Sequence, residues 1–243
     1  MLHGWEHSSL LRTNIFPQTV APKRTDDDFR NGVYNNHYQV YKVRENGKLR
    51  KIAALTPLLQ LPIDIIEYVV VSDSLHLFHL GVMKRLLLFY KDGHKGLKEN
   101  KWSKDKIDSI SNVLKAVKLP AEIHRAVRGM EYLNHWKASE CASFLHYIGI
   151  VLLRHFISED HFQNFANLFC ALTICSTDYY KRFLSVAQKL FEEFIKQYYM
   201  QFNSITSNIH NLVHVVDEVT RFGSLPSISS YPFENHLFQI KKC

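Results

Sequence analysis

Apolar side chains at helical spacing dominate the chain after residue 76 and predict a series of helices. The first spans residues 77–90, where apolar residues recur every three or four positions until Gly93 interrupts the pattern. The second spans residues 103–118, with Ser103 as its N-cap. Further helices are predicted at about residues 136–156, 158–175, 178–202 and 208–222, and a last one begins near Tyr231.

The pattern before residue 77 is different. Residues 1–55 are polar and irregular and predict no regular element. The β-branched run from Val69 to Val71 is expected to be a buried strand leading to Asp73, a place at a sheet edge where ligands and ions bind. The alternative is that Asp73 caps the following helix by accepting backbone N–H bonds.

The totals are those of an ordinary globular protein. Of the 243 residues, 46% are apolar and 13% aromatic, which suits a core rich in rings. The cysteines at positions 141, 170, 175 and 243 form no C-x-x-C pair, which favours buried thiols in a reduced intracellular compartment. No signal peptide and no membrane-spanning stretch is predicted, so we expect a soluble protein without a membrane partner.

Positive charge is concentrated after the predicted strand. The net charge is +7, and between residues 84 and 128 twelve Lys and Arg residues stand against five Asp and Glu residues. A basic zone of this kind is able to hold a phosphate backbone. The alternative is a solvated lysine-rich face that serves solubility.

Motifs for metal binding or nucleophilic catalysis are weak. The pairs His76 with His79 and His210 with His214 have the spacing of two zinc ligands on one helix face, but neither is an H-E-x-x-H motif. For His210 and His214 the alternative is hydrogen bonding of both rings within a helical core. The sequence has no G-x-S-x-G, no glycine-rich phosphate loop and no cysteine in an activating context.

Carboxylates remain as candidates for chemistry. A two-metal site needs two or three Asp or Glu side chains that converge from separate elements. Asp73, Glu140 and Glu234 are the candidates. A Glu near a helix start also interacts favourably with the helix dipole, and spacing alone does not separate the two interpretations.

Blocks of sequence in a fixed order resemble the transposases of the CACTA (En/Spm) group. Asp73-Ser-Leu-His76 and the following Leu80-Gly-Val-Met-Lys84-Arg-Leu-Leu are similar to D-x-x-H and L-G-V-x-K-x-L-L around the family's second catalytic Asp. The other blocks are Arg24-Thr-Asp-Asp-Asp-Phe29 with His37, Trp136-Lys-Ala-Ser-Glu140 with Phe144-Leu-His-Tyr147, Asn208-Ile-His210-Asn-Leu-Val-His214, Phe222-Gly-Ser-Leu225 and Ser230-Tyr-Pro-Phe-Glu234. Together they cover most of the chain.

The resemblance implies a DDE transposase core. The fold class is then α+β and predominantly α-helical, with an incomplete RNase H-like core and a large helical insertion. Asp73 would be the second catalytic acid and Glu234 the third, with Glu140 kept as the alternative third acid. His76 would orient Asp73 or contact DNA.

The same resemblance implies a cofactor and partners. Asp73 and Glu234 would bind Mg²⁺ or Mn²⁺ once the site is complete, and the metals would activate water and then a 3′-hydroxyl. DNA at the transposon ends would be the partner, with Lys84 and Arg85 on its backbone. Self-association and other proteins are further candidate partners, and the family implies a nuclear location.

The chain also departs from the family pattern. The family's first catalytic Asp and its C-x-x-C pair belong upstream of the Arg24 block, and this sequence starts too late to contain them. A site that lacks one carboxylate does not hold both metals, so we expect the chain to be inactive alone.

Four segments are expected along the chain. They are an irregular segment at 1–60, a strand and helix of the core at 61–95, the helical insertion at 96–225, and the truncated start of the final catalytic helix at 226–243. The hypothesis is a transposase-derived protein that retains DNA or protein binding. The alternative is a helical protein-interaction or structural domain with no catalytic role.

Overall fold

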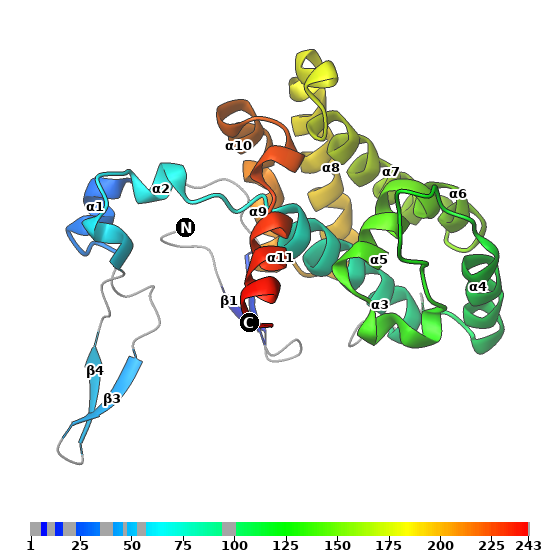
Figure 1. Cartoon of the computed structure of the whole chain (residues 1–243), viewed down its shortest axis with the longest axis horizontal. Helices are drawn as coiled ribbons and strands as arrows, with labels where there is room; N and C mark the ends of the chain where they lie inside the picture. Colours follow the sequence, from blue (N-terminus) through cyan, green and yellow to red (C-terminus); the bar gives the residue numbers. More distant parts are fainter. Residues whose placement is uncertain are drawn as a thin grey trace. The chain divides into compact units, whose positions relative to one another are not determined.

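Helix predominates in the protein (Figure 1). The computed structural model describes residues 6–8, 13–16, 23–34, 41–45, 48–52, 57–93 and 101–242. The chain forms two compact units, a smaller one of residues 1–5 and 17–70 and a larger one of residues 6–16 and 71–243. The prediction of a predominantly α-helical chain is therefore confirmed.

Arg30 links several elements of the smaller unit. The elements of this unit are α1 (Asp26–Arg30), β3 (Tyr41–Glu45), β4 (Lys48–Ile52), η2 (Pro57–Gln60) and α2 (Ile65–Tyr68). The Arg30 guanidinium pairs with Asp26 at 2.6 Å and donates to the carbonyls of Leu59 at 2.7 Å and Ile63 at 2.8 Å. These charge-assisted bonds hold η2 and the segment after it to α1.

Strands occur where the sequence predicted no regular element. In the larger unit β1 (Glu6–Ser8) pairs antiparallel with β2 (Thr13–Ile15), and in the smaller unit β3 pairs antiparallel with β4. The N–H of Phe16 donates to the carbonyl of Ile205 at 2.6 Å, which ties the end of β2 to the helices of the larger unit. The prediction that residues 1–55 hold no element is wrong at these places.

The helices of the larger unit follow the predicted order. They are η3 (Ser74–Met83), α3 (Lys84–Asp92), α4 (Lys104–Ala116), η4 (Met130–His135), α5 (Ala138–Ser143), η5 (Phe144–Ile148), α6 (Gly149–Leu152), η6 (Leu153–His155), α7 (Glu159–Cys175), η7 (Asp178–Phe183), α8 (Leu184–Phe202), α9 (Ser207–Asn211), η8 (Leu212–His214), α10 (Val215–Phe222), η9 (Leu225–Ile228) and α11 (Tyr231–Ile240). Elements η3 and η5 are π-helical. Ser103 caps α4 as predicted, because it accepts the N–H of Lys106 at 3.2 Å.

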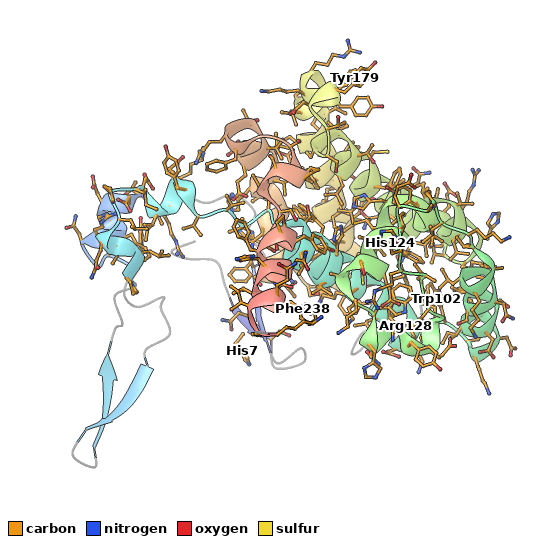
Figure 2. The ribbon with its side chains drawn as sticks, viewed as in Figure 1. His7, Trp102, His124, Arg128, Tyr179 and Phe238 are labelled. Carbon is orange, nitrogen blue, oxygen red and sulfur yellow. The ribbon has the colours of Figure 1, made fainter. Side chains whose placement is uncertain are left out.

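The core of the larger unit is aromatic, as its composition predicted. Helices α7 and α8 pack along each other, and Phe191, Phe194 and Tyr198 of α8 are buried. Element η7 connects α7 to α8, and Tyr179 projects from it (Figure 2). Among the described helices, none combines the length and apolar character that crossing a membrane requires.

The predicted strand at Val69–Val71 is wrong. Val69 is 47% exposed and no strand is formed there. The N–H groups of Val71 and Ser72 instead donate to the carboxylate of Glu218 on α10, at 3.1 Å and 2.8 Å. This carboxylate takes the donors that a neighbouring strand would need. Asp73 therefore stands at the start of a helix, and the described residues 57–72 before it form no strand.

Gly81 allows close packing in the middle of η3. A Cβ at this position would lie 2.6 Å from the carbonyl oxygen of His76 and 2.7 Å from the Asn208 side chain. Only glycine avoids both contacts without a shift of its surroundings. The glycine of the L-G-V block thus lets α9 approach the turn that carries His76.

Candidate functional site

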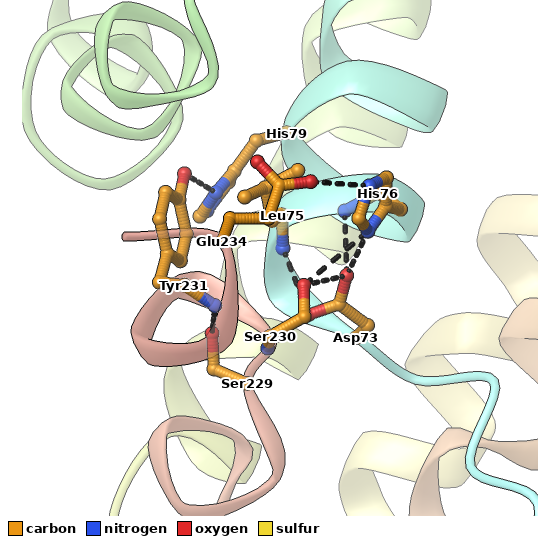
Figure 3. Close-up of polar contacts among 8 residues, drawn as sticks. All are labelled: Asp73, Leu75, His76, His79, Ser229, Ser230, Tyr231 and Glu234. Atoms are coloured by element: carbon orange, nitrogen blue, oxygen red, sulfur yellow. Dashed lines mark hydrogen bonds and ion pairs between the residues drawn. The ribbon is translucent and has the colours of Figure 1, made fainter. Parts of the chain in front are cut away.

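Asp73 caps the helix that follows it. Its carboxylate accepts the N–H of Leu75 at 3.3 Å and the N–H of His76 at 2.9 Å (Figure 3). The capping interpretation of the sequence is therefore confirmed. Asp73 nevertheless has further partners, which come from the other end of the larger unit's sequence.

Ser230, which directly precedes α11, gives Asp73 two more donors. Its N–H lies 2.7 Å from Oδ1 and its hydroxyl donates to Oδ2 at 2.8 Å (Figure 3). Burial raises the pKa of Asp73, but the hydrogen bonds from Ser230 and His76 outweigh burial and lower the pKa to about 2. Asp73 is thus a carboxylate at neutral pH, held by donors from both η3 and the start of α11.

His76 bridges Asp73 and Glu234. Its Nδ1 lies 2.5 Å from Oδ2 of Asp73, and its Nε2 lies 3.0 Å from Oε1 of Glu234 (Figure 3). The ring therefore stands between two carboxylates, with one nitrogen facing each of them. The structure therefore brings together the three residues that the sequence singled out as catalytic.

A buried set of side chains lies beside this bridge. Nδ1 of His79 is 2.7 Å from the hydroxyl of Tyr231, and its Nε2 is 3.2 Å from Nε2 of His146. A neutral His79 satisfies both contacts in either tautomer. Burial, together with neighbouring His146, lowers the pKa of His79 to about 3, and burial also lowers the pKa of His146. His79 is therefore a neutral link between η3, η5 and α11. It contacts Tyr231 and His146, whereas His76 contacts Asp73 and Glu234.

Ser230, His76 and Asp73 do not form a nucleophilic triad. In such a triad the serine contacts one ring nitrogen and the aspartate the other. Here the Ser230 hydroxyl lies 3.3 Å from Nδ1, the nitrogen that faces Asp73, and donates a hydrogen bond to Asp73. The hydroxyl is a partner of the carboxylate and is not activated by a base.

The site in this arrangement does not fit Mg²⁺ or Mn²⁺. A carboxylate offers about four lone-pair sites, and Asp73 already accepts bonds from Leu75, His76 and Ser230. The ring of His76 also stands between Asp73 and Glu234, with a nitrogen against each carboxylate. Within the described ranges, no three His, Cys, Asp or Glu side chains are grouped as a metal site requires.

Glu140, the alternative third acid, is fully buried and bound by Arg128. Two guanidinium nitrogens donate to its two oxygens at 2.8 Å and 2.7 Å, and the N–H of Lys137 donates at 2.9 Å. Burial raises the pKa of Glu140, but the Arg128 contact and the backbone donors bring it below the ordinary value. Glu140 thus fastens α5 to the segment before η4, and Glu234 is the acid beside His76.

Lys84 and Arg85, the predicted DNA contacts, both interact within the fold. Nζ of Lys84 donates to the carbonyls of Asn134 at 3.0 Å and Trp136 at 3.1 Å. The guanidinium of Arg85 lies over the ring of Phe89, 5.3 Å from its centroid. Their role in DNA binding stays a prediction.

The pair His210 and His214 packs within the larger unit. Their rings meet edge to face at 5.7 Å, and the ring of Phe16 stacks on His210 at 5.6 Å. Burial and the neighbouring His214 lower the pKa of His210 to about 4. Nδ1 of His210 is buried without a hydrogen-bond partner. This nitrogen therefore does not make the hydrogen bond that the alternative interpretation predicted.

Two of the cysteines behave as the sequence predicted. Cys141 and Cys175 are buried, and burial raises the pKa of each thiol to about 12. Cys170 is exposed, so the prediction of a buried thiol is wrong there. Cys243 lies outside the described residues.

Sequence reasoning missed the residues that complete the site. Ser230 and Tyr231 were noticed only as part of a block, His79 only as half of a possible zinc pair, and Glu218 not at all. Their contacts join parts of the chain that lie far apart in sequence. The serine before an expected helix start was the one local signal, since serine there is a usual donor and acceptor.

Comparisons with models of protein families, with curated proteins and with solved structures gave no match. The resemblance to CACTA transposases therefore stays a prediction.

Proposed function

We propose that the chain derives from a DDE-type transposase of the CACTA group and binds DNA without catalysing transposition by itself. The observation that carries this proposal is the meeting of Asp73, His76 and Glu234. The resemblance makes Asp73 and Glu234 the second and third acids of one site, and His76 contacts them at 2.5 Å and 3.0 Å. Two acids from distant blocks at one place are what such an ancestry requires.

The proposed fold is an RNase H-like core interrupted by the helices between residues 96 and 225. In such a core the segment before Asp73 would pair with another strand, which would replace Glu218 as the partner of Val71 and Ser72. The lack of activity is proposed because the bonds on Asp73 leave no room for a metal ion. A nuclear location belongs to the same proposal.

DNA binding is assigned to the exposed cations of α4 and the segment after it. Between residues 101 and 128 the chain has seven Lys and Arg residues and three Asp and Glu residues. Several of these cations are engaged within the protein, as Arg128 is with Glu140 (Figure 2 labels Arg128). Lys104, Lys118 and Arg125 are exposed, which suits contact with phosphate groups.

The test is the salt dependence of binding to a mixed-sequence DNA duplex, measured by fluorescence anisotropy. The logarithm of the association constant is expected to fall linearly with the logarithm of salt concentration. In the double variant Lys118→Gln with Arg125→Gln, the magnitude of this negative slope is expected to decrease by about two units, roughly one for each lost phosphate contact. Lys189→Gln, an exposed lysine of α8, is the matched control and keeps the wild-type slope. Absent or salt-insensitive binding contradicts the proposal.

Protein binding without DNA is the second candidate. It is favoured by α11, where Phe233 is 72% exposed and Leu237, Phe238 and Ile240 are each 56% exposed. Apolar side chains gathered on one exposed element are typical of protein contacts. The salt series separates the candidates, because a protein-interaction domain has no reason to bind the duplex.

A further inference from the structure

We infer that Asp73 is a metal-free clasp that fastens the start of α11 to η3. Apolar burial does not hold this helix, because none of the residues from Tyr231 to Ile240 is buried. Polar links join its first turn to the rest of the larger unit. These links run from Ser230 to Asp73, from Tyr231 to His79 and from Glu234 to His76.

The link to Asp73 carries most of the attachment. The Asp73 side chain is only 15% exposed, and Ser230 donates to both of its oxygens. Donors to a desolvated charge make strong bonds. The link between His76 and Glu234 is weak by comparison, because their side chains are 58% and 52% exposed and water screens the pair. The Tyr231 link joins two neutral groups, so it lacks charge assistance.

A metal ion and the clasp exclude each other. A divalent cation on Asp73 would need the lone pairs that now accept the Ser230 N–H and hydroxyl. If Asp73 and Glu234 were metal ligands, added metal would tighten the start of α11. If Asp73 is a clasp, added metal leaves α11 no more firmly held than before. The two roles therefore predict different responses of the same helix.

Hydrogen exchange of the whole chain, read by mass spectrometry, tests the clasp. In Asp73→Asn and in Ser230→Ala, exchange in residues 231–240 is expected to rise roughly tenfold, the factor that corresponds to about 1.4 kcal/mol. Exchange in α7 and α8 is expected to stay unchanged. Asp92→Asn, an exposed acid at the end of α3, is the matched control. Unchanged exchange of α11 in both clasp variants overturns the inference.

The second arm repeats the measurement with Mn²⁺ added to the wild-type chain. Protection of residues 231–240 is expected to stay constant or to decrease. Protection that rises with Mn²⁺ in the wild type but not in Asp73→Asn overturns the clasp and supports a metal site. If Asp73→Asn fails to fold, Ser230→Ala decides the first arm, since Asp73 keeps its cap bonds to η3 in that variant. DNA binding is measured separately, so its absence affects the proposed function and leaves the clasp untouched.

Discussion

Two buried or half-buried carboxylates show how partners decide the role of a single residue. Asp73 and Glu140 both stand at the start of a helix, and both have a pKa below the ordinary value despite burial. Asp73 receives neutral donors and a histidine, whereas Glu140 receives a bidentate guanidinium from Arg128. Removal of one buried charge from such a pair costs stability, because the partner and the backbone donors lose their acceptor.

Removal of the Glu140 charge is accordingly expected to destabilise the larger unit. In Glu140→Gln an amide group faces the guanidinium of Arg128, so we expect a loss of about 2–3 kcal/mol in the free energy of unfolding. The loss is placed below the range for fully buried pairs because the Arg128 side chain is 40% exposed. Urea unfolding followed by circular dichroism measures it. Glu192→Gln, on the exposed side of α8, is the control, and equal stability of the two variants would contradict the assigned role.

At the scale of the element, η3 shows competition between helix propensity and packing. Ten residues from Ser74 to Met83 form a π-helical segment, and seven of them are buried. Gly81 is a poor helix former, yet its missing Cβ admits both the His76 carbonyl and the Asn208 side chain. The packing of α9 on η3 therefore depends on the absence of one methyl group.

Gly81→Ala is expected to destabilise the protein although alanine is the better helix former. Propensity favours alanine by up to about 1 kcal/mol, and overpacking in a well-packed interior costs about 1–3 kcal/mol. Since the backbone oxygen at 2.6 Å is unable to move freely, we expect a net loss of about 1–2 kcal/mol. Thermal unfolding is a sufficient measurement. Ser109→Ala on the exposed side of α4 serves as control, and a rise in stability for Gly81→Ala refutes the packing argument.

At the scale of the whole molecule, the sequence predicts the elements whose formation depends on residues close to one another in the chain. Helices α4, α7 and α8 follow from the spacing of their apolar residues, and α4 also from its Ser103 cap. The cap role of Asp73 was visible for the same local reason as that of Ser103. The strand predicted at Val69–Val71 is not formed, and the N–H of Val71 donates to Glu218, which is remote in sequence. The hairpin of β3 and β4 was missed although Asn46-Gly47 between the strands is a hairpin signal. Glu234 was linked to Asp73 only through the resemblance of whole blocks. The position of Ser230 before an expected helix start indicated a capping residue, but not its bonds to Asp73.

Buried histidines give the larger unit an expected sensitivity to acid. Burial lowers the pKa of His79 to about 3 and that of His210 to about 4, and it also lowers the pKa of His146 and His161. The unfolded chain protonates its histidines near pH 6.5. Below that pH the unfolded state binds more protons than the folded state, so stability falls as the pH decreases towards the folded pKa values.

The free energy of unfolding is therefore expected to decrease between neutral pH and about pH 5, by up to about 1.4 kcal/mol per pH unit for each buried histidine. Urea unfolding at several pH values measures this slope. In His79→Gln the slope is expected to lose the contribution of one proton, because glutamine does not titrate while the amide still offers a donor and an acceptor to Tyr231 and His146. The exposed His124, replaced by Gln, is the control and keeps the full slope. Stability that is constant across this range would show that the buried rings take up protons without opening the fold.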